Sequence, residues 1–90
     1  MASYNVSLVP SAIRQLRNLD PDTRRRVAER IGDLTENPFS HGAIQLQGHY
    51  SPPLYRVRVG DYRIVYTIDR CCFAVTIHGL APRDKIYDQF

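Results

Sequence analysis

Three arginines lie close together in the segment YRVRVGDYRIVY, residues 55–66, at spacings that favour anion binding. Gly60-Asp61 at the centre of the segment is typical of a two-residue β-hairpin turn. This turn sets Arg58 directly opposite Arg63, and Arg56 lies on the same face because strand side chains alternate between faces. Like charges directly opposite each other destabilise a hairpin. Since guanidinium groups bind phosphate oxygens in pairs, we expect this face to hold a phosphate or a similar anion.

The chemistry of such a face depends on the anion that it binds. Phosphate contacts alone supply affinity and orientation. On an RNA backbone they also permit cleavage, because arginines stabilise the negative charge that develops when a 2′-hydroxyl attacks the adjacent phosphate. Arginine stays protonated and cannot accept the hydroxyl proton. Tyr87 is the candidate base, since positive charge nearby favours its phenolate form, and a short helical turn would place it beside Arg83. His78 is an alternative base, although a single histidine at a strand end is more often incidental.

The composition agrees with a small soluble domain that has an anionic partner. The 90 residues suffice for one domain, and the net charge is +3. Eleven of the twelve basic residues are arginines, and Lys85 is the only lysine. A solvated arginine-rich surface without a specific partner explains the same charge. No apolar run is long enough to cross a membrane, and residues 1–10 do not form a secretion signal, so we expect a cytoplasmic protein without membrane contact.

The sequence contains no motif for a metal or a cofactor. Cys71 and Cys72 are adjacent, and neighbours on a strand point to opposite faces, so we expect both to be reduced strand residues. His41 and His49 have no cysteine or carboxylate at ligand spacing. Gly60 stands alone rather than in a glycine-rich phosphate loop. We therefore expect no metal and no cofactor.

The first part of the chain predicts one strand and two helices. Residues 4–9 alternate in polarity as a strand does. A helix opens at Pro10-Ser11, and a second helix follows Asp20, a typical N-cap, and ends at Asn37-Pro38. The expected buried positions of the first helix are Ile13, Leu16 and Leu19. Those of the second are Val27, Ile31 and Leu34.

The rest of the chain predicts strands. The connector at residues 39–53 holds a short strand near 44–46, and Gly79–Pro82 ends the last strand. Between these limits, the expected strands cover residues 55–59, 62–68 and about 72–78. A two-residue turn near Asp69-Arg70 would set Tyr66 opposite Phe73. The apolar face of this meander comprises Tyr55, Val57, Val59, Tyr62, Ile64, Tyr66, Ile68, Phe73, Val75 and Ile77.

These elements predict a single α+β domain over residues 1–90. Two N-terminal helices cover one face of an antiparallel four-stranded sheet, and a short helical turn ends the chain. The opposite face carries the arginines among smaller side chains, in a shallow depression.

Two blocks of the sequence, LQGHYSPPLYRVRVGDYRIVYTI and VTIHGLAPRDKIY, resemble the RelE branch of the RelE/ParE toxin superfamily. The similar features are a Leu-x-Gly connector, a Tyr-basic-x-basic strand, a Gly-x-Tyr-Arg turn and an arginine four residues before a tyrosine. The order of one strand, two helices and three further strands also agrees, so the resemblance covers nearly the whole chain. It implies a RelE-like toxin of a type II toxin–antitoxin system, a ribosome-dependent endoribonuclease that cuts mRNA in the A site without a metal and so inhibits translation.

The resemblance also implies roles for individual residues. Arg63 matches the arginine that stabilises the scissile phosphate, and Tyr87 matches a tyrosine involved in proton transfer or base stacking. The implied catalytic set is Arg56, Arg58, Arg63, Arg83 and Tyr87. The implied RNA-binding set is Arg56, Arg58, Arg63 and Lys85. Two features depart from the family pattern, because arginines replace lysines at 56 and 58 and Leu80-Ala81-Pro82 replaces basic residues before Arg83.

The same resemblance implies partners and leaves two alternatives. A toxin of this branch pairs with a cognate RelB-like antitoxin and engages the ribosome and mRNA, without a small-molecule cofactor. The ParE branch shares the fold but inhibits DNA gyrase, and it generally lacks this set of arginines and tyrosine, so the set favours the nuclease. A catalytically weak RNA-binding relative is the remaining alternative.

Overall fold

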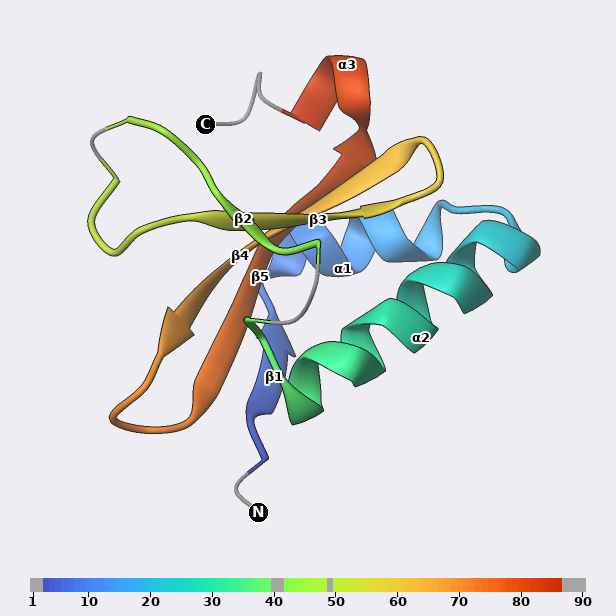
Figure 1. Ribbon diagram of the computed structural model, residues 1–90. Helices are drawn as coiled ribbons and strands as arrows, with labels where there is room; N and C mark the ends of the chain where they lie inside the picture. Colours follow the sequence, from blue (N-terminus) through green and yellow to red (C-terminus); the bar gives the residue numbers. More distant parts are fainter. Residues whose placement is uncertain (1–2, 40–41, 49, 87–90) are drawn as a thin grey trace.

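The computed structural model describes residues 3–39, 42–48 and 50–86. All its strands belong to one five-stranded sheet in the order β1-β5-β4-β3-β2 (Figure 1). The elements in chain order are β1 (Asn5–Leu8), α1 (Pro10–Arg17), α2 (Pro21–Glu36), β2 (Ile44–Gln45), β3 (Tyr55–Val59), β4 (Tyr62–Asp69), β5 (Ala74–Pro82) and α3 (Arg83–Ile86). The α+β class is confirmed, as are the two N-terminal helices and the short C-terminal helix.

The prediction of an antiparallel four-stranded sheet is wrong in two respects. β1 pairs with β5 in parallel, with Val6 beside Val75, so the sheet is mixed. A parallel pair needs a long crossover, which α1, α2 and the following strands supply here. β2 adds a fifth strand by pairing Ile44 with Arg56. The short strand expected near 44–46 is confirmed at Ile44–Gln45, but its place in the main sheet was not predicted.

Two of the three predicted positions in the first helical segment, Leu16 and Leu19, lie in the core, whereas Ala12 replaces Ile13 as the third. Ala12 is fully buried, whereas Ile13 is 37% exposed. Ala12 and Leu16 of α1, and Leu19 just after its end, lie in or against the core cluster, and α1 packs against β5. Gln15 on the same side accepts a hydrogen bond at 2.8 Å from the backbone amide of Leu80. The prediction that Ile13 is buried is therefore wrong.

α2 begins and ends where the sequence predicts. The Asp20 side chain caps it by accepting a hydrogen bond at 3.1 Å from the Thr23 amide and another at 2.6 Å from the Thr23 hydroxyl. These bonds hold the pKa of Asp20 below its usual value. Val27 and Leu34 are fully buried and Ile31 packs beside them, which confirms the predicted stripe.

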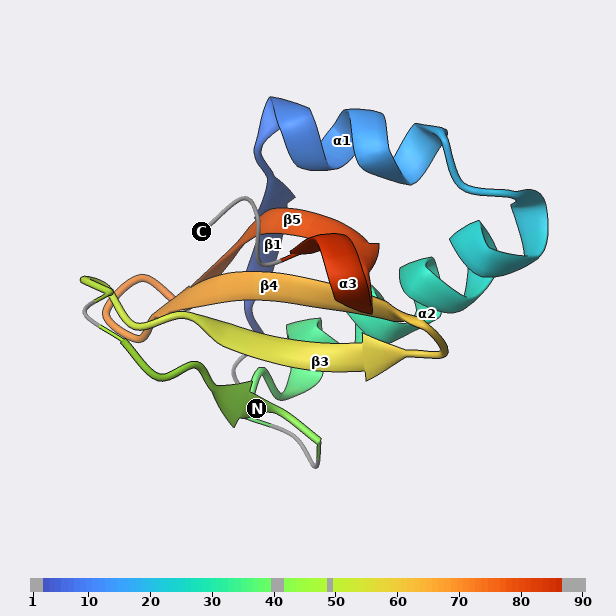
Figure 2. The same ribbon diagram turned by 90° about the horizontal axis from the view of Figure 1, so that it is seen from above.

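The two faces of the sheet bury apolar clusters of different size. α1 and α2 cover the larger one, which includes Val57, Ile64 and Ile77. On the other face, Ile86 of α3 packs against a smaller cluster of Leu54, Val65 and Ala81. Figure 2 shows α3 lying over the ends of β4 and β5, the two strands that it contacts. The smaller cluster anchors α3 on the face that carries the arginines.

The hairpin of β3 and β4 has the predicted register, with Arg58 opposite Arg63. The pairing of β4 with β5 does not, because Tyr66 lies opposite Ile77 rather than Phe73. The connecting loop spans residues 70–73, since the Asp69 carboxylate accepts hydrogen bonds from the amides of Cys71 and Cys72 and stabilises a longer turn.

Three predictions near this loop are corrected as a result. Phe73 adopts a positive φ of 50° and is exposed, so it is not part of the core. Cys71 and Cys72 are free, as expected, but they lie exposed in the loop rather than on a strand. β5 also continues through Gly79 to Pro82, because an irregularity between Val65 and Tyr66 shifts the register and keeps the strand paired with β4.

Candidate functional site

A hollow of about 570 Å³ lies at the turn between β3 and β4, where β5 ends. Arg58 comes from β3, Arg63 from β4 and Arg83 from the first position of α3. The full lining is Arg58, Gly60, Asp61, Arg63, Pro82, Arg83 and Asp84. Three of the predicted site residues therefore meet in one place, although Arg83 is 20 residues beyond Arg63 in the sequence.

Arg63 is the buried arginine of this hollow. Its side chain is only 6% exposed, whereas those of Arg58 and Arg83 are exposed. On β5 the residue opposite Arg63 is Ala81, whose small side chain leaves room for the guanidinium. The like-charged pair of Arg58 and Arg63 costs about 0.2–1 kcal/mol. The apolar residues on the other face of the same hairpin offset this cost.

A backbone hydrogen bond places Arg83 next to the hairpin. The Arg83 amide donates to the carbonyl oxygen of Asp61 at 3.0 Å, which ties the start of α3 to the β3–β4 turn. This contact exists because β5 stays paired up to Pro82, opposite Tyr62. Because β5 is longer than predicted, Arg83 lies at the site.

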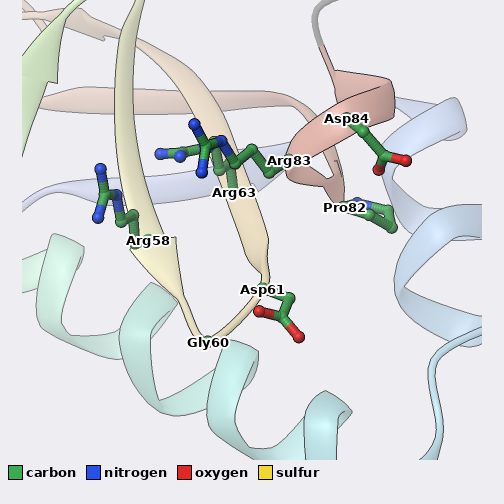
Figure 3. Close-up of a pocket in the computed structure, with 7 residues that line it drawn as sticks. All are labelled: Arg58, Gly60, Asp61, Arg63, Pro82, Arg83 and Asp84. Atoms are coloured by element: carbon green, nitrogen blue, oxygen red, sulfur yellow. The ribbon is translucent and has the colours of Figure 1, made fainter.

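The positive and the negative side chains of the hollow lie on different sides of it. Figure 3 shows the side chains of Arg63 and Arg83 extending toward the side where the Arg58 guanidinium lies, with the carboxylates of Asp61 and Asp84 set apart from them. Within the part of the chain that the structure describes, neither Asp61 nor Asp84 forms an ion pair with Arg58 or Arg83. The arrangement concentrates positive charge on one side of the hollow, where an anion can bind.

Arg56 lies in a second hollow rather than the first. This hollow, of about 420 Å³, is lined by Arg30, Gly42, Ile44, Arg56 and Arg58. Lys85 is exposed on α3 and lines neither hollow. Tyr87 lies outside the described residues. The predicted set is therefore divided between two neighbouring hollows, with Arg58 in both.

Comparison with known proteins identifies the family. The model of the ParE toxin of the type II toxin–antitoxin system, parDE, matches residues 6–87. This chain belongs to the RelE/ParE toxin superfamily. It is thus a toxin of a type II toxin–antitoxin system with the RelE/ParE fold. A search of curated proteins gives no significant match.

Solved structures of RelE toxins share the fold of this toxin. A chain of the archaeal RelE–RelB complex from Pyrococcus horikoshii OT3 is 29% identical, with a TM-score of 0.78 over 90% of this chain and 96% of that one. The RelBE2 toxin–antitoxin complex from Mycobacterium tuberculosis gives 29% identity and a TM-score of 0.78 over 90% and 99%. The isolated E. coli RelE toxin is 20% identical, with a TM-score of 0.77 over 97% and 94%, and shows the fold alone. The first two relatives were crystallised with an antitoxin.

Among the residues that the structure describes, no group of three or more His, Cys, Asp or Glu is placed to hold a metal ion. None of the helices in the same residues has the length and apolar character needed to cross a bilayer.

His78 is separate from the arginines. It lines a different hollow with Tyr50, Pro52 and Leu54, and its Nε2 lies 2.9 Å from the Thr67 hydroxyl oxygen. Burial lowers the pKa of His78 below its usual 6.5. Tyr66 is likewise unsuited to act as a base, since it donates a buried hydrogen bond to the Pro38 carbonyl at 2.7 Å and burial raises its pKa to about 12.

The depressed pKa of His78 predicts a specific dependence of stability on pH. The unfolded chain binds the His78 proton at a higher pH than the folded chain, so the free energy of unfolding falls as the pH drops through 6.5. We expect His78→Gln to show a smaller loss of stability between about pH 7.5 and about pH 5.5, measured by urea denaturation. His41 and His49 are present in both proteins and cancel in the comparison. Equal losses in the two proteins would contradict the assignment.

Three charged side chains of the two hollows were not predicted as site residues from the sequence. In the local pattern, Asp61 is a turn residue and Asp84 lies at the start of a helix. No spacing in the sequence connects these two residues with each other. Arg30 is four residues after Arg26 on a helix whose arginines are typical of a solvated face. Arg30 is three residues after Val27 and therefore borders the buried stripe. This spacing is the one sequence feature that places it nearer the sheet than Arg24 to Arg26.

Proposed function

We propose that this toxin is an endoribonuclease that cuts mRNA in the ribosomal A site and thereby inhibits translation. The observation that carries the proposal is the convergence of Arg58, Arg63 and Arg83 on one hollow. A phosphodiester in that hollow meets guanidinium groups from three separate elements. Relatives of the same fold are described as RelE toxins, which supports the nuclease branch.

In the proposed reaction, the 2′-oxygen forms a bond to the adjacent phosphorus as the bond to the 5′-oxygen breaks. The phosphorane between these states carries additional negative charge on its equatorial oxygens. Arg63, fixed by burial, and the exposed Arg58 and Arg83 stabilise this charge more strongly than they stabilise the substrate. The arginines supply the positive charge that a metal ion provides in other nucleases.

Proton transfer is assigned to Tyr87 in this proposal. Arginine cannot accept the proton of the 2′-hydroxyl, so arginines at 56 and 58 remove the lysines that serve other family members as candidate bases. Leu80 and Ala81, which replace basic residues of the family pattern, are buried at 1% and 6% exposure and pack in the two cores. They cannot protonate the 5′-oxygen as it leaves, so water or a group of the ribosome supplies that proton.

The site is exposed to solvent, which suits a large substrate and a partner protein that covers the site. Arg58 and Arg83 are exposed, so an mRNA strand held by the ribosome can reach them. The same exposed charge suits an acidic antitoxin segment. Because relatives are crystallised with RelB, we infer that a RelB-like antitoxin binds this toxin and neutralises the hollow.

Induction of the toxin in bacteria tests the proposal. We expect growth arrest together with new mRNA 5′ ends inside translated frames, detected by sequencing of RNA ends. The Arg83→Gln variant, in which one cation of the hollow is lost, should produce few such ends at equal expression. Arrest with intact mRNA would refute the nuclease proposal.

The matching family model names ParE, which makes gyrase inhibition the second candidate. It predicts a DNA-damage response and stalled replication while mRNA remains uncut. The third candidate function, that of a non-catalytic RNA-binding relative, predicts neither growth arrest nor mRNA cleavage. The same induction experiment therefore separates all three functions.

A further inference from the structure

The second hollow has the features of an anion site of its own. Three of its five lining residues are arginines, Arg30, Arg56 and Arg58. Arg58 also lines the first hollow, so the two are adjacent and share a cation. Within the described residues, β2 pairs with β3 only at Tyr55 and Arg56, so the edge of β3 beyond Arg56 is not hydrogen-bonded to β2. A chain-like anion in the first hollow can therefore continue along this edge into the second.

The spacing of the strand arginines suits consecutive phosphates. Arg56 and Arg58 are two residues apart on β3, so their Cα atoms are separated by about 6.8 Å. Successive phosphates along an extended single strand are separated by a comparable distance. A regular β-strand therefore places one guanidinium near each phosphate, without any distortion of its backbone.

Arg30 reaches the second hollow from a different element. It lies on α2, which packs against β3. Its Nη2 atom is 3.6 Å from the point where a Cβ of residue 42 would lie, so the Arg30 guanidinium lies next to the backbone of Gly42. Arg30 forms an ion pair with Asp33 at 3.5 Å, in which the Arg30 side chain is 20% exposed and the Asp33 side chain is 66% exposed. Because the carboxylate of this pair is largely in water, the pair is weak, and a phosphate can compete with Asp33 for Arg30.

We propose that the second hollow binds the phosphate next to the scissile one, with Arg30 and Arg56 as its cations and Arg58 shared between the two phosphates. Ile44, which lies opposite Arg56 and is 48% exposed, offers an apolar contact for a ribose or base. The identity of the strand as RNA rests on the proposed function. Arg56 is then a substrate-binding residue and does not touch the reacting phosphate.

Short RNAs that cannot be cleaved test this subsite. The probes are a fully 2′-O-methylated dinucleotide with one phosphate and a trinucleotide with two, titrated against the purified toxin by NMR. We expect Arg30→Gln to weaken trinucleotide binding about fivefold at about 0.1 M salt and to reduce the salt slope by about 0.7, as for one phosphate contact. Binding of the dinucleotide should not change. Arg26→Gln, an exposed arginine on the same helix, is the matched control and should leave both affinities unchanged.

The outcomes separate this proposal from the proposed function. If the toxin fails to cut mRNA in cells but Arg30→Gln weakens only trinucleotide binding, the subsite stands and the nuclease proposal fails. If the toxin cuts mRNA but Arg30→Gln behaves like Arg26→Gln, the subsite is refuted. Equal losses for both probes, absence of trinucleotide binding by the wild type, or a loss confined to antitoxin binding would each refute it as well.

Discussion

Replacing Arg63 with glutamine should lower the rate of mRNA cleavage by about 10²–10³-fold, the effect of removing one buried donor that stabilises a charged transition state. Arg63 is the least exposed of the three cations in the first hollow, so its charge is the least screened by water. Arg63 also lies on β4, which pairs with β3 on one side and β5 on the other, so its backbone is held on both sides. The loss should appear in kcat with a smaller change in KM, because the interaction strengthens in the transition state.

The measurement is single-turnover cleavage on programmed ribosomes, with circular dichroism to confirm the fold. Arg63→Lys keeps the charge but loses bidentate geometry, and we expect it to retain an intermediate rate. Arg25→Gln is the matched control, since Arg25 is an exposed arginine whose partner is Asp22. A folded Arg63→Gln variant with the wild-type rate would remove Arg63 from the proposed mechanism.

Replacing Ile86 with alanine should have the second largest effect, and it should act on both stability and activity. Ile86 is fully buried against Leu54, Val65 and Ala81. Removing a buried isoleucine side chain to alanine costs about 2–5 kcal/mol of unfolding free energy. Because α3 is held to the sheet by this small cluster, part of the loss should appear as local opening of α3, which displaces Arg83 from the hollow.

Urea denaturation and hydrogen exchange at residues 83–86 measure these two components, and mRNA cleavage measures the consequence. Ile13→Ala is a control with the same chemical change, because Ile13 is 37% exposed on α1. We expect it to change the unfolding free energy by less than about 0.5 kcal/mol. Equal destabilisation by the two substitutions would show that the second cluster does not anchor α3.

Local signals in the sequence were sufficient for the hairpin and the second helix. Gly60 adopts a φ of +58° in the turn, which glycine tolerates readily, and this turn sets the register of Arg58 and Arg63. Asp20 and Pro21 begin α2 through contacts within four residues. Such features depend on neighbouring residues alone, so no knowledge of the rest of the chain is needed to predict them.

Longer-range pairing could not be predicted from the same patterns. The length of the turn after β4 depends on whether the Asp69 side chain accepts hydrogen bonds from the following amides. The length of this turn determines the register of every residue of β5 against β4. The parallel pairing of β1 with β5 joins segments about 70 residues apart, which no local pattern encodes. The burial of Ala12 in place of Ile13 likewise depends on how α1 packs against β5, which no local pattern encodes.

By itself, the sequence determined the fold class, the apolar face of the hairpin and the set of arginines that face away from the core. The tertiary structure decided how those arginines are grouped. Extension of β5 to Pro82 and the hydrogen bond from Arg83 to Asp61 bring Arg83 to Arg58 and Arg63. The approach of α2 to β3 brings Arg30 to Arg56. Alternation along a strand specifies which face a side chain occupies, whereas strand register and helix packing specify which distant charge lies beside it.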